Sequence, residues 1–212
     1  MSDGARTVVT SDGIALEAEL VTPTDGVSRA GMVLCHPHPQ YGGTMRSIVI
    51  SALFDALPRA GVTCLRFNFR GVENSEGEHD EGRGERLDAV AAIEVLDEEL
   101  VSTIPLVLTG WSFGGDIALG TVHDRIAAWF AIAPPLRFHH DVEAVAHDPR
   151  LKLLALAEHD EFRSPASIVE ATASWANTEI EVVGGASHFF VGRTDRLVTL
   201  ATAFVDRLSE RA

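Results

Sequence analysis

Residues 105–123, PLVLTGWSFGGDIALGTVH, contain the pattern that decides the fold. The apolar run from Pro105 to Thr109 predicts a strand, and the segment from Phe113 to about His123 predicts a helix. Between them lies GWSFG (110–114), a GxSxG sequence. Small residues on both sides of Ser112 allow a tight turn that lifts the serine hydroxyl clear of the sheet edge. GxSxG sequences also occur in ordinary turns, but the strand before and the helix after this one favour a nucleophile.

The rest of the chain alternates short strand-like runs with segments of helical period, a pattern typical of a mostly parallel sheet with helices on both faces. The expected strands are Thr7–Val9, Ile14–Val21, Ala30–Cys35, Val62–Phe69, Ala127–Ile132, Leu151–Ala157 and Ile180–Val183. The expected helices are Ser47–Arg59, 87–100, 166–176 and 194–208. The longest irregular connection, 134–150, is too short for a substantial lid. We therefore predict an α/β fold with about eight strands, forming one domain over residues 1–212, with little or no cap.

Composition narrows the range of partners. With 212 residues, 46% of them hydrophobic, the chain can bury a large core without disulfide or metal staples. The net charge of −14 would repel nucleic acids and anionic lipid surfaces. No signal peptide is evident, and no run approaches the roughly 20 apolar residues of a membrane span. We expect a soluble, cytoplasmic protein that acts on a small ester or acyl substrate, with its oligomeric state open. Cys35 and Cys64 lie in apolar runs and should be buried free thiols.

A serine hydroxyl becomes a nucleophile only when a base accepts its proton, and that base needs an orienting acid. His188, in GGASHFF after the last expected strand, is the histidine best placed to return over the sheet edge toward Ser112. Four other histidines fall at helix ends or in the 134–150 connection and are expected in solvent: His123, His139, His140 and His147. The alternative for His188 is a loop histidine without a catalytic part.

The orienting acid should leave the end of a strand between the serine and the histidine in chain order. Asp160 does so within LLALAEHDEFRSP (153–165). Glu158 and Glu161 are its neighbours and Asp148 precedes the strand, so these three stay alternatives. A helix cap or a solvated loop carboxylate is the other explanation for Asp160.

The oxyanion of a tetrahedral intermediate needs two backbone N–H donors. The first is expected from Phe113, directly after the nucleophile. The second should come from the loop HPHPQYGGTM (36–45), whose two prolines have no N–H, which leaves His38 as donor. His36 is expected to orient this loop through a hydrogen bond. A metal site on HPHP is the weaker alternative because no third ligand is evident. We expect neither a metal nor a cofactor.

Together these motifs resemble the α/β-hydrolase superfamily, specifically its small lidless serine hydrolases, which are similar to dienelactone-hydrolase-like and acyl-peptidase-like proteins. The resemblance covers nearly the whole chain. HPHPQYGGTM looks like the oxyanion loop of that branch, RFNFRGVENSEG (66–77) like the loop after its next strand, GWSFGG like its nucleophile elbow and SHFF like its histidine loop. The resemblance implies a triad of Ser112, Asp160 and His188.

The chain departs from the pattern of this branch at two places. Glu73 stands where a glycine is usual, and Ala157 and Glu158 replace a turn that usually contains glycine. Dienelactone hydrolases proper use a cysteine nucleophile, so Ser112 argues against that activity.

We therefore expect hydrolysis of carboxylic esters through an acyl-enzyme. The alternatives are a thioesterase or small peptidase with the same triad, and a catalytically silent binding protein on the same fold. Four phenylalanines are candidates for the acyl site, with core or loop packing as the alternative: Phe138, Phe162, Phe189 and Phe190. Trp111 either shapes the pocket or packs against the sheet. The acidic run 73–85 is either a solvated loop or a rim that disfavours anionic substrates.

Overall fold

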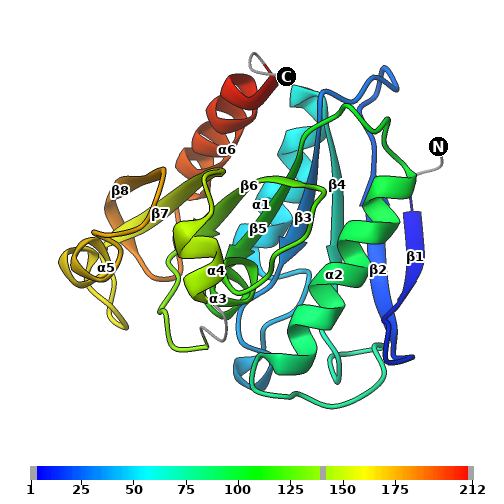
Figure 1. Cartoon of the computed structure of the whole chain (residues 1–212), viewed down its shortest axis with the longest axis horizontal. Coiled ribbons are helices and arrows are strands. Elements are labelled where there is room, and N and C mark those ends of the chain that lie inside the picture. Colours follow the sequence, from blue (N-terminus) through cyan, green and yellow to red (C-terminus); the bar gives the residue numbers. More distant parts are fainter. Residues whose placement is uncertain (1–3, 139–141, 210–212) are drawn as a thin grey trace.

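An eight-stranded sheet runs through the molecule in the order β1-β2-β4-β3-β5-β6-β7-β8 (Figure 1). The computed structural model describes residues 4–138 and 142–209. Strands β3 to β8 pair in parallel, while β2 is antiparallel to both β1 and β4. The strands are β1 (Gly4–Val9), β2 (Ala15–Val21), β3 (Ala30–Cys35), β4 (Val62–Phe67), β5 (Leu106–Trp111), β6 (Ile126–Ile132), β7 (Leu151–His159) and β8 (Thr178–Ser187). The predicted mostly parallel sheet of about eight strands is confirmed.

Helices cover both faces of this sheet. They are α1 (Ile48–Ala56), α2 (Arg83–Glu98), α3 (Phe113–Leu119), α4 (Val142–His147), α5 (Pro165–Ala171) and α6 (Thr194–Ser209). The apolar sides of α1 and α6 pack in one core layer, and those of α2, α3, α4 and α5 pack in the other (Figure 1). Each face of the sheet therefore has its own hydrophobic core.

The burial of the strands follows from these layers. β3 lies inside the sheet with helices on both faces, so all six of its residues are buried, and its sequence is a continuous apolar run. β2 lies near the edge and alternates partly exposed with buried residues. Because parallel strands end at the same edge of a sheet, the loops after β3, β5, β7 and β8 meet there.

Four helices differ from the sequence expectation, among them α2, which spans Arg83–Glu98 rather than 87–100. α1 ends at Ala56 and continues as a 3₁₀ turn over Leu57–Ala60, because Pro58 has no N–H for an α-helical bond. α3 ends at Leu119, directly before Gly120, rather than near His123. α5 ends at Ala171 rather than at 176.

The expected irregular connection 134–150 also contains a helix, α4. This helix is only six residues long, and nothing else in the described part of that connection forms a helix or strand. The fold therefore carries no substantial cap between β6 and β7 within the described ranges. The predictions for His139 and His140 lie outside the described residues.

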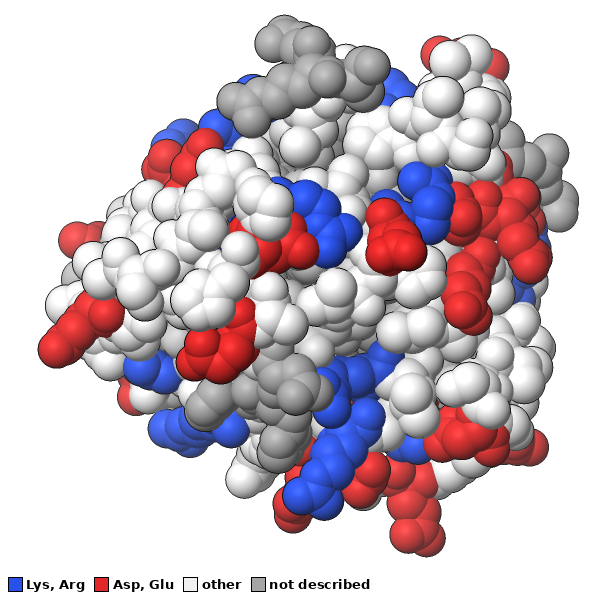
Figure 2. All heavy atoms as spheres, in the orientation of Figure 1, with Lys and Arg blue, Asp and Glu red and all other residues white. Residues whose placement is uncertain are grey.

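Acidic side chains are spread over the face shown in Figure 2, with basic side chains between them. Several acids pair with arginines, as in Arg207 with Glu179 at 2.7 Å. Cys35 and Cys64 are buried free thiols, as predicted, and burial raises the pKa of both. Within residues 4–138 and 142–209, no helix has the length and apolar character needed to cross a membrane.

Candidate active site

The turn between β5 and α3 places Ser112 in a strained conformation, with φ 56° and ψ −119°. This turn needs glycine on both sides. A Cβ on Gly110 would lie 1.9 Å from the carbonyl oxygen of Gly114, and a Cβ on Gly114 would lie 2.2 Å from that of Cys35. The Ser112 N–H donates to the carbonyl of Ile132 at 2.8 Å. The GxSxG sequence therefore forms the predicted sharp turn at the edge of the sheet.

Three predicted residues come together at this edge. The Oγ of Ser112 lies 2.9 Å from Nε2 of His188, and Nδ1 of His188 lies 2.8 Å from Oδ2 of Asp160. Asp160 directly follows β7, and His188 directly follows β8. His188 is buried, with 5% of its surface exposed. Residues far apart in sequence thus form one continuous hydrogen-bond chain.

The Asp160 carboxylate is held by its own loop as well as by the histidine. Its Oδ1 accepts hydrogen bonds from the N–H groups of Phe162 at 2.9 Å and Arg163 at 3.2 Å. Burial raises the pKa of Asp160, but the hydrogen bonds from His188 and from these amides outweigh burial and hold the pKa below its usual value. The carboxylate is therefore ionised at neutral pH.

The other candidate acids make different contacts. Oε2 of Glu158 accepts from the N–H of Gly185 at 2.7 Å, and Asp148 pairs with Arg150 at 2.6 Å. Oε2 of Glu161 accepts from the backbone N–H of His188 at 3.1 Å. Glu161 therefore contacts the main chain of His188 and not its imidazole ring.

Trp111 also contacts the main chain of the histidine. Its indole N–H donates to the carbonyl oxygen of His188 at 3.1 Å. Only 4% of Trp111 is exposed, and its ring packs in the same core layer as α1 and α6. The contacts of Trp111 and Glu161 with His188 have no signal in the sequence, because they join positions that are distant in the chain.

The loop after β3 brings His38 to the same site. The N–H of Gly43 donates to the carbonyl of His38 at 3.0 Å, and a Cβ on Gly43 would lie 2.1 Å from the Pro37 oxygen. The rings of His38 and Phe113 lie 4.9 Å apart. Burial, followed by the nearby His79, lowers the pKa of His38, which favours the neutral ring.

His36 makes the loop-orienting hydrogen bond predicted from the sequence. Its Nε2 accepts from the N–H of Phe69 at 3.0 Å, so Nδ1 carries the proton and donates to the Pro37 oxygen at 2.6 Å. Burial lowers the pKa of His36 to about 3. A neutral histidine therefore ties the loop after β3 to the loop after β4.

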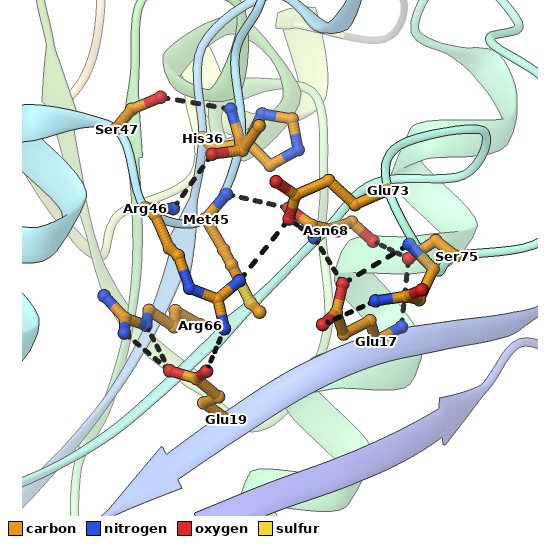
Figure 3. Close-up of polar contacts among 12 residues, drawn as sticks. Glu17, Glu19, His36, Met45, Arg46, Ser47, Arg66, Asn68, Glu73 and Ser75 are labelled. Carbon is orange, nitrogen blue, oxygen red and sulfur yellow. Dashed lines mark hydrogen bonds and ion pairs between the residues drawn. The ribbon is translucent and has the colours of Figure 1, made fainter.

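Asn68 strengthens the link between these two loops (Figure 3). Its Oδ1 accepts from the N–H of Met45 at 2.8 Å, and its Nδ2 donates to Glu17 and Glu73, each at 2.7 Å. Glu73 has a positive φ of 48°, which explains why a glycine suits this position. Here its carboxylate also pairs with Arg46 at 3.4 Å. The departure at Glu73 is therefore part of a polar network that supports the loop.

A cavity of about 570 Å³ opens beside Ser112. Its lining residues are Pro37, His38, Tyr41, Gly42, Gly43, Ser47, Ile48, Trp111, Ser112, Phe113, Pro135, Arg137, Phe138, Phe162, His188 and Phe189. Three of the four candidate phenylalanines line it, whereas Phe190 follows the alternative of core packing and is fully buried with α6. The acidic run 73–85 contributes no residue to the lining.

Asp116, in the first turn of α3, holds one wall of this cavity. Its buried carboxylate accepts hydrogen bonds from the backbone N–H groups of Leu136 at 2.8 Å, Arg137 at 2.7 Å and Phe138 at 2.9 Å. A carboxylate that accepts several amides is a strong anchor for a loop. The helix that follows Ser112 therefore fixes the wall segment 136–138, which contributes Arg137 and Phe138 to the cavity lining.

The structure adds no support for the alternative that the HPHP sequence (36–39) binds a metal ion. In the part of the chain that the structure describes, no three His, Cys, Asp or Glu side chains gather in a way that could hold a metal ion.

This fold, with a serine at the turn after a central strand and a histidine and an aspartate after later strands, is that of an α/β hydrolase. No family model matches the sequence. An α/β serine hydrolase homologue from Coxiella burnetii superposes with a TM-score of 0.84 and 30% identity, covering 96% of this chain and 97% of that one. A lidless α/β serine hydrolase from Xanthomonas campestris gives a TM-score of 0.80 and 26% identity, covering 100% and 95%. The chain belongs to the α/β serine hydrolases, and residues 4–138 and 142–209 contain no substantial lid.

The chain is also similar in sequence to an uncharacterised protein. A protein of Rickettsia prowazekii is 32% identical over 173 residues, which are 77% of this chain and 73% of that protein. The similarity thus covers most of both chains.

Proposed function

We propose that this protein is a serine hydrolase that cleaves carboxylic esters of small molecules through an acyl-enzyme. The observation that carries the proposal is the hydrogen-bond chain from Ser112 through His188 to Asp160, with distances of 2.9 and 2.8 Å, at the wall of an open cavity. Both distances lie in the range of a nucleophile activated by an oriented base. A binding protein on this fold would not need such an alignment.

In the proposed reaction, Oγ of Ser112 attacks the carbonyl carbon while Nε2 of His188 takes the hydroxyl proton. Asp160 keeps the Nδ1–H tautomer of His188 and stabilises the imidazolium. The backbone N–H groups of Phe113 and His38 donate to the oxyanion. His188 then protonates the leaving alcohol, and the same residue activates the water that releases the acid.

The surroundings of the serine support small esters as substrates. The cavity of about 570 Å³ has a largely aromatic lining, which suits acyl or aryl groups of modest size. Thioesters and peptide bonds need the same groups, so a thioesterase or a small peptidase is the alternative within this mechanism. We propose that residues 1–212 act as one domain in this reaction.

Hydrolysis of a nitrophenyl ester series, from acetyl to dodecanoyl, tests the proposal. We expect activity on short acyl chains that is lost in Ser112→Ala. Ser102→Ala is the matched control, because Ser102 is exposed before β5, outside the cavity lining. Equal activity in Ser112→Ala and the unmodified protein would contradict Ser112 as the nucleophile. Activity in neither protein would favour the other bonds or a binding role.

A further inference from the structure

Arg137 carries the one permanent charge among the described residues that line the cavity. The other lining residues are aromatic, aliphatic, glycine, proline, serine or histidine. Arg137 is exposed, and its guanidinium makes no hydrogen bond or ion pair with any residue in ranges 4–138 and 142–209. A free cation therefore lies at the wall of a cavity that also contains the serine.

The backbone of Arg137 is fixed relative to the serine. Its N–H donates to Asp116 at 2.7 Å, and the N–H of Asp116 donates to the Ser112 carbonyl at 3.1 Å. On the other side, Arg163 donates to the Pro135 oxygen at 2.7 Å. Two hydrogen bonds thus connect Arg137 to Ser112, so the side chain extends from a rigid position in the wall.

Carboxylates on the neighbouring loops make hydrogen bonds with residues other than Arg137. Asp160 faces His188, and Glu161 accepts from the backbone of the same residue. In the acidic run, Glu73 binds Asn68, and Glu85 accepts from the N–H of Gly82 at 2.8 Å. None of these residues lines the cavity, so none of them contacts a ligand bound there.

The net charge of −14 opposes anionic ligands at long range, but salt screens exposed charges beyond about 8 Å at physiological ionic strength. At contact distance a guanidinium binds a carboxylate through two parallel hydrogen bonds. We propose that Arg137 makes this site selective for esters that carry a carboxylate on their acyl or alcohol part. This inference rests on the proposed ester hydrolysis and names its substrate class.

Two pairs of rigid aryl esters test the selectivity. On the alcohol side, 4-acetoxybenzoate is compared with 4-acetoxybenzamide. On the acyl side, the mono(4-nitrophenyl) ester of terephthalate is compared with 4-nitrophenyl 4-carbamoylbenzoate. The para position keeps the carboxylate from attacking its own ester, and each amide is a neutral partner of similar shape. The readout is the ratio of kcat/KM for the acid to that for the amide, measured at low salt.

We expect the ratio for at least one pair to fall about tenfold in Arg137→Gln, the size of a charge-assisted hydrogen bond at a partly exposed site. Arg137→Lys should retain part of the preference because it keeps the charge. Arg196→Gln is the matched control: it removes the same charge from an exposed position on α6, outside the cavity, and should leave the ratio unchanged.

The outcomes separate this inference from the proposed function. Ser112-dependent cleavage with ratios that Arg137→Gln does not change would overturn the inference and leave the proposed function intact. An equal fall in Arg137→Lys and Arg137→Gln, or in Arg196→Gln, would also overturn it. If the unmodified protein cleaves short nitrophenyl esters but none of these four, only the inference fails. If it cleaves neither set, the proposed function fails, and the inference fails with it.

Discussion

The indole N–H of Trp111 donates to the backbone carbonyl of His188 at 3.1 Å. Through this bond the residue directly before the serine holds the residue that contacts the serine hydroxyl. Glu161 accepts from the N–H of the same histidine, so both backbone groups of His188 are engaged. Trp111 and Glu161 are therefore positioning residues in the proposed mechanism: each acts through His188.

We predict that Trp111→Phe lowers kcat about fivefold on a short nitrophenyl ester, with little change in KM. The phenyl ring keeps much of the packing but loses a hydrogen bond of about 1 kcal/mol. Trp129→Phe is the matched control, because the buried Trp129 indole donates to the Thr121 carbonyl, also at 3.1 Å, outside the cavity lining. Both variants should lose similar stability. An equal fall in kcat in both would contradict a positioning role.

We predict that Gly114→Ala destabilises the protein by about 3 kcal/mol and lowers ester hydrolysis strongly. The added Cβ would lie 2.2 Å from the Cys35 oxygen, so α3 and the Phe113 amide must move away from β3. Gly184→Ala is the control, because the nearest atom to its new Cβ is Glu158 Oε2 at 3.9 Å. It should lower the free energy of unfolding by less than about 1 kcal/mol. Unfolding in urea measures the stability of both variants. Equal stability of the two variants would contradict the close approach of α3 and β3.

We predict that Asp116→Asn raises KM and lowers stability by about 2 kcal/mol, because an amide cannot accept from the three N–H groups that the carboxylate binds. For a protein of this size the melting temperature should fall by about 4–8 °C. Asp195→Asn changes the same charge at an exposed site on α6 and should leave both quantities unchanged. An unchanged KM in Asp116→Asn would show that the wall segment does not depend on this carboxylate.

We predict that His36 makes stability fall in acid. Burial lowers its pKa to about 3 in the folded protein, whereas an unfolded histidine has a pKa of about 6.5. Between these values the unfolded chain binds a proton that the folded protein does not. The contribution of His36 is therefore complete above pH 6.5 and decreases by about 1.4 kcal/mol per pH unit as the pH falls toward 3.

The free energy of unfolding, measured in urea between pH 7 and 5, tests this dependence. His36→Gln should remove that part of the slope, whereas His147→Gln, at an exposed position on α4, should keep it. The same slope in all three proteins would contradict a neutral buried His36.

Local patterns in the sequence predicted much of the fold and the site. Gly110, Ser112 and Gly114 are adjacent to a strand and a helix, so their turn follows from short-range sterics. His188 and Asp160 follow from the order in which strands end at one sheet edge. The expected helix to Arg59 is too long, because the apolar pattern continues past Ala56 although Pro58 ends the α-helical hydrogen bonding there.

Contacts between distant segments could not be predicted. The bonds of Trp111 and Glu161 to His188, and of Asp116 to the wall segment, depend on how β5, α3 and later loops meet in space. The burial of Phe190 has the same origin, since its sequence position is one residue from Phe189 in the cavity wall. Such pairings leave no periodic signal in one sequence.

The proposed mechanism requires that Ser112 is an activated nucleophile. Intact-protein mass spectrometry after reaction with a serine-directed fluorophosphonate tests it most directly, because the reagent needs an activated hydroxyl and little substrate fit. We predict one adduct per chain, located on Ser112, absent in Ser112→Ala and formed much more slowly in His188→Ala. No adduct on the unmodified protein, or the same adduct on Ser112→Ala, would show that Ser112 is not an activated nucleophile.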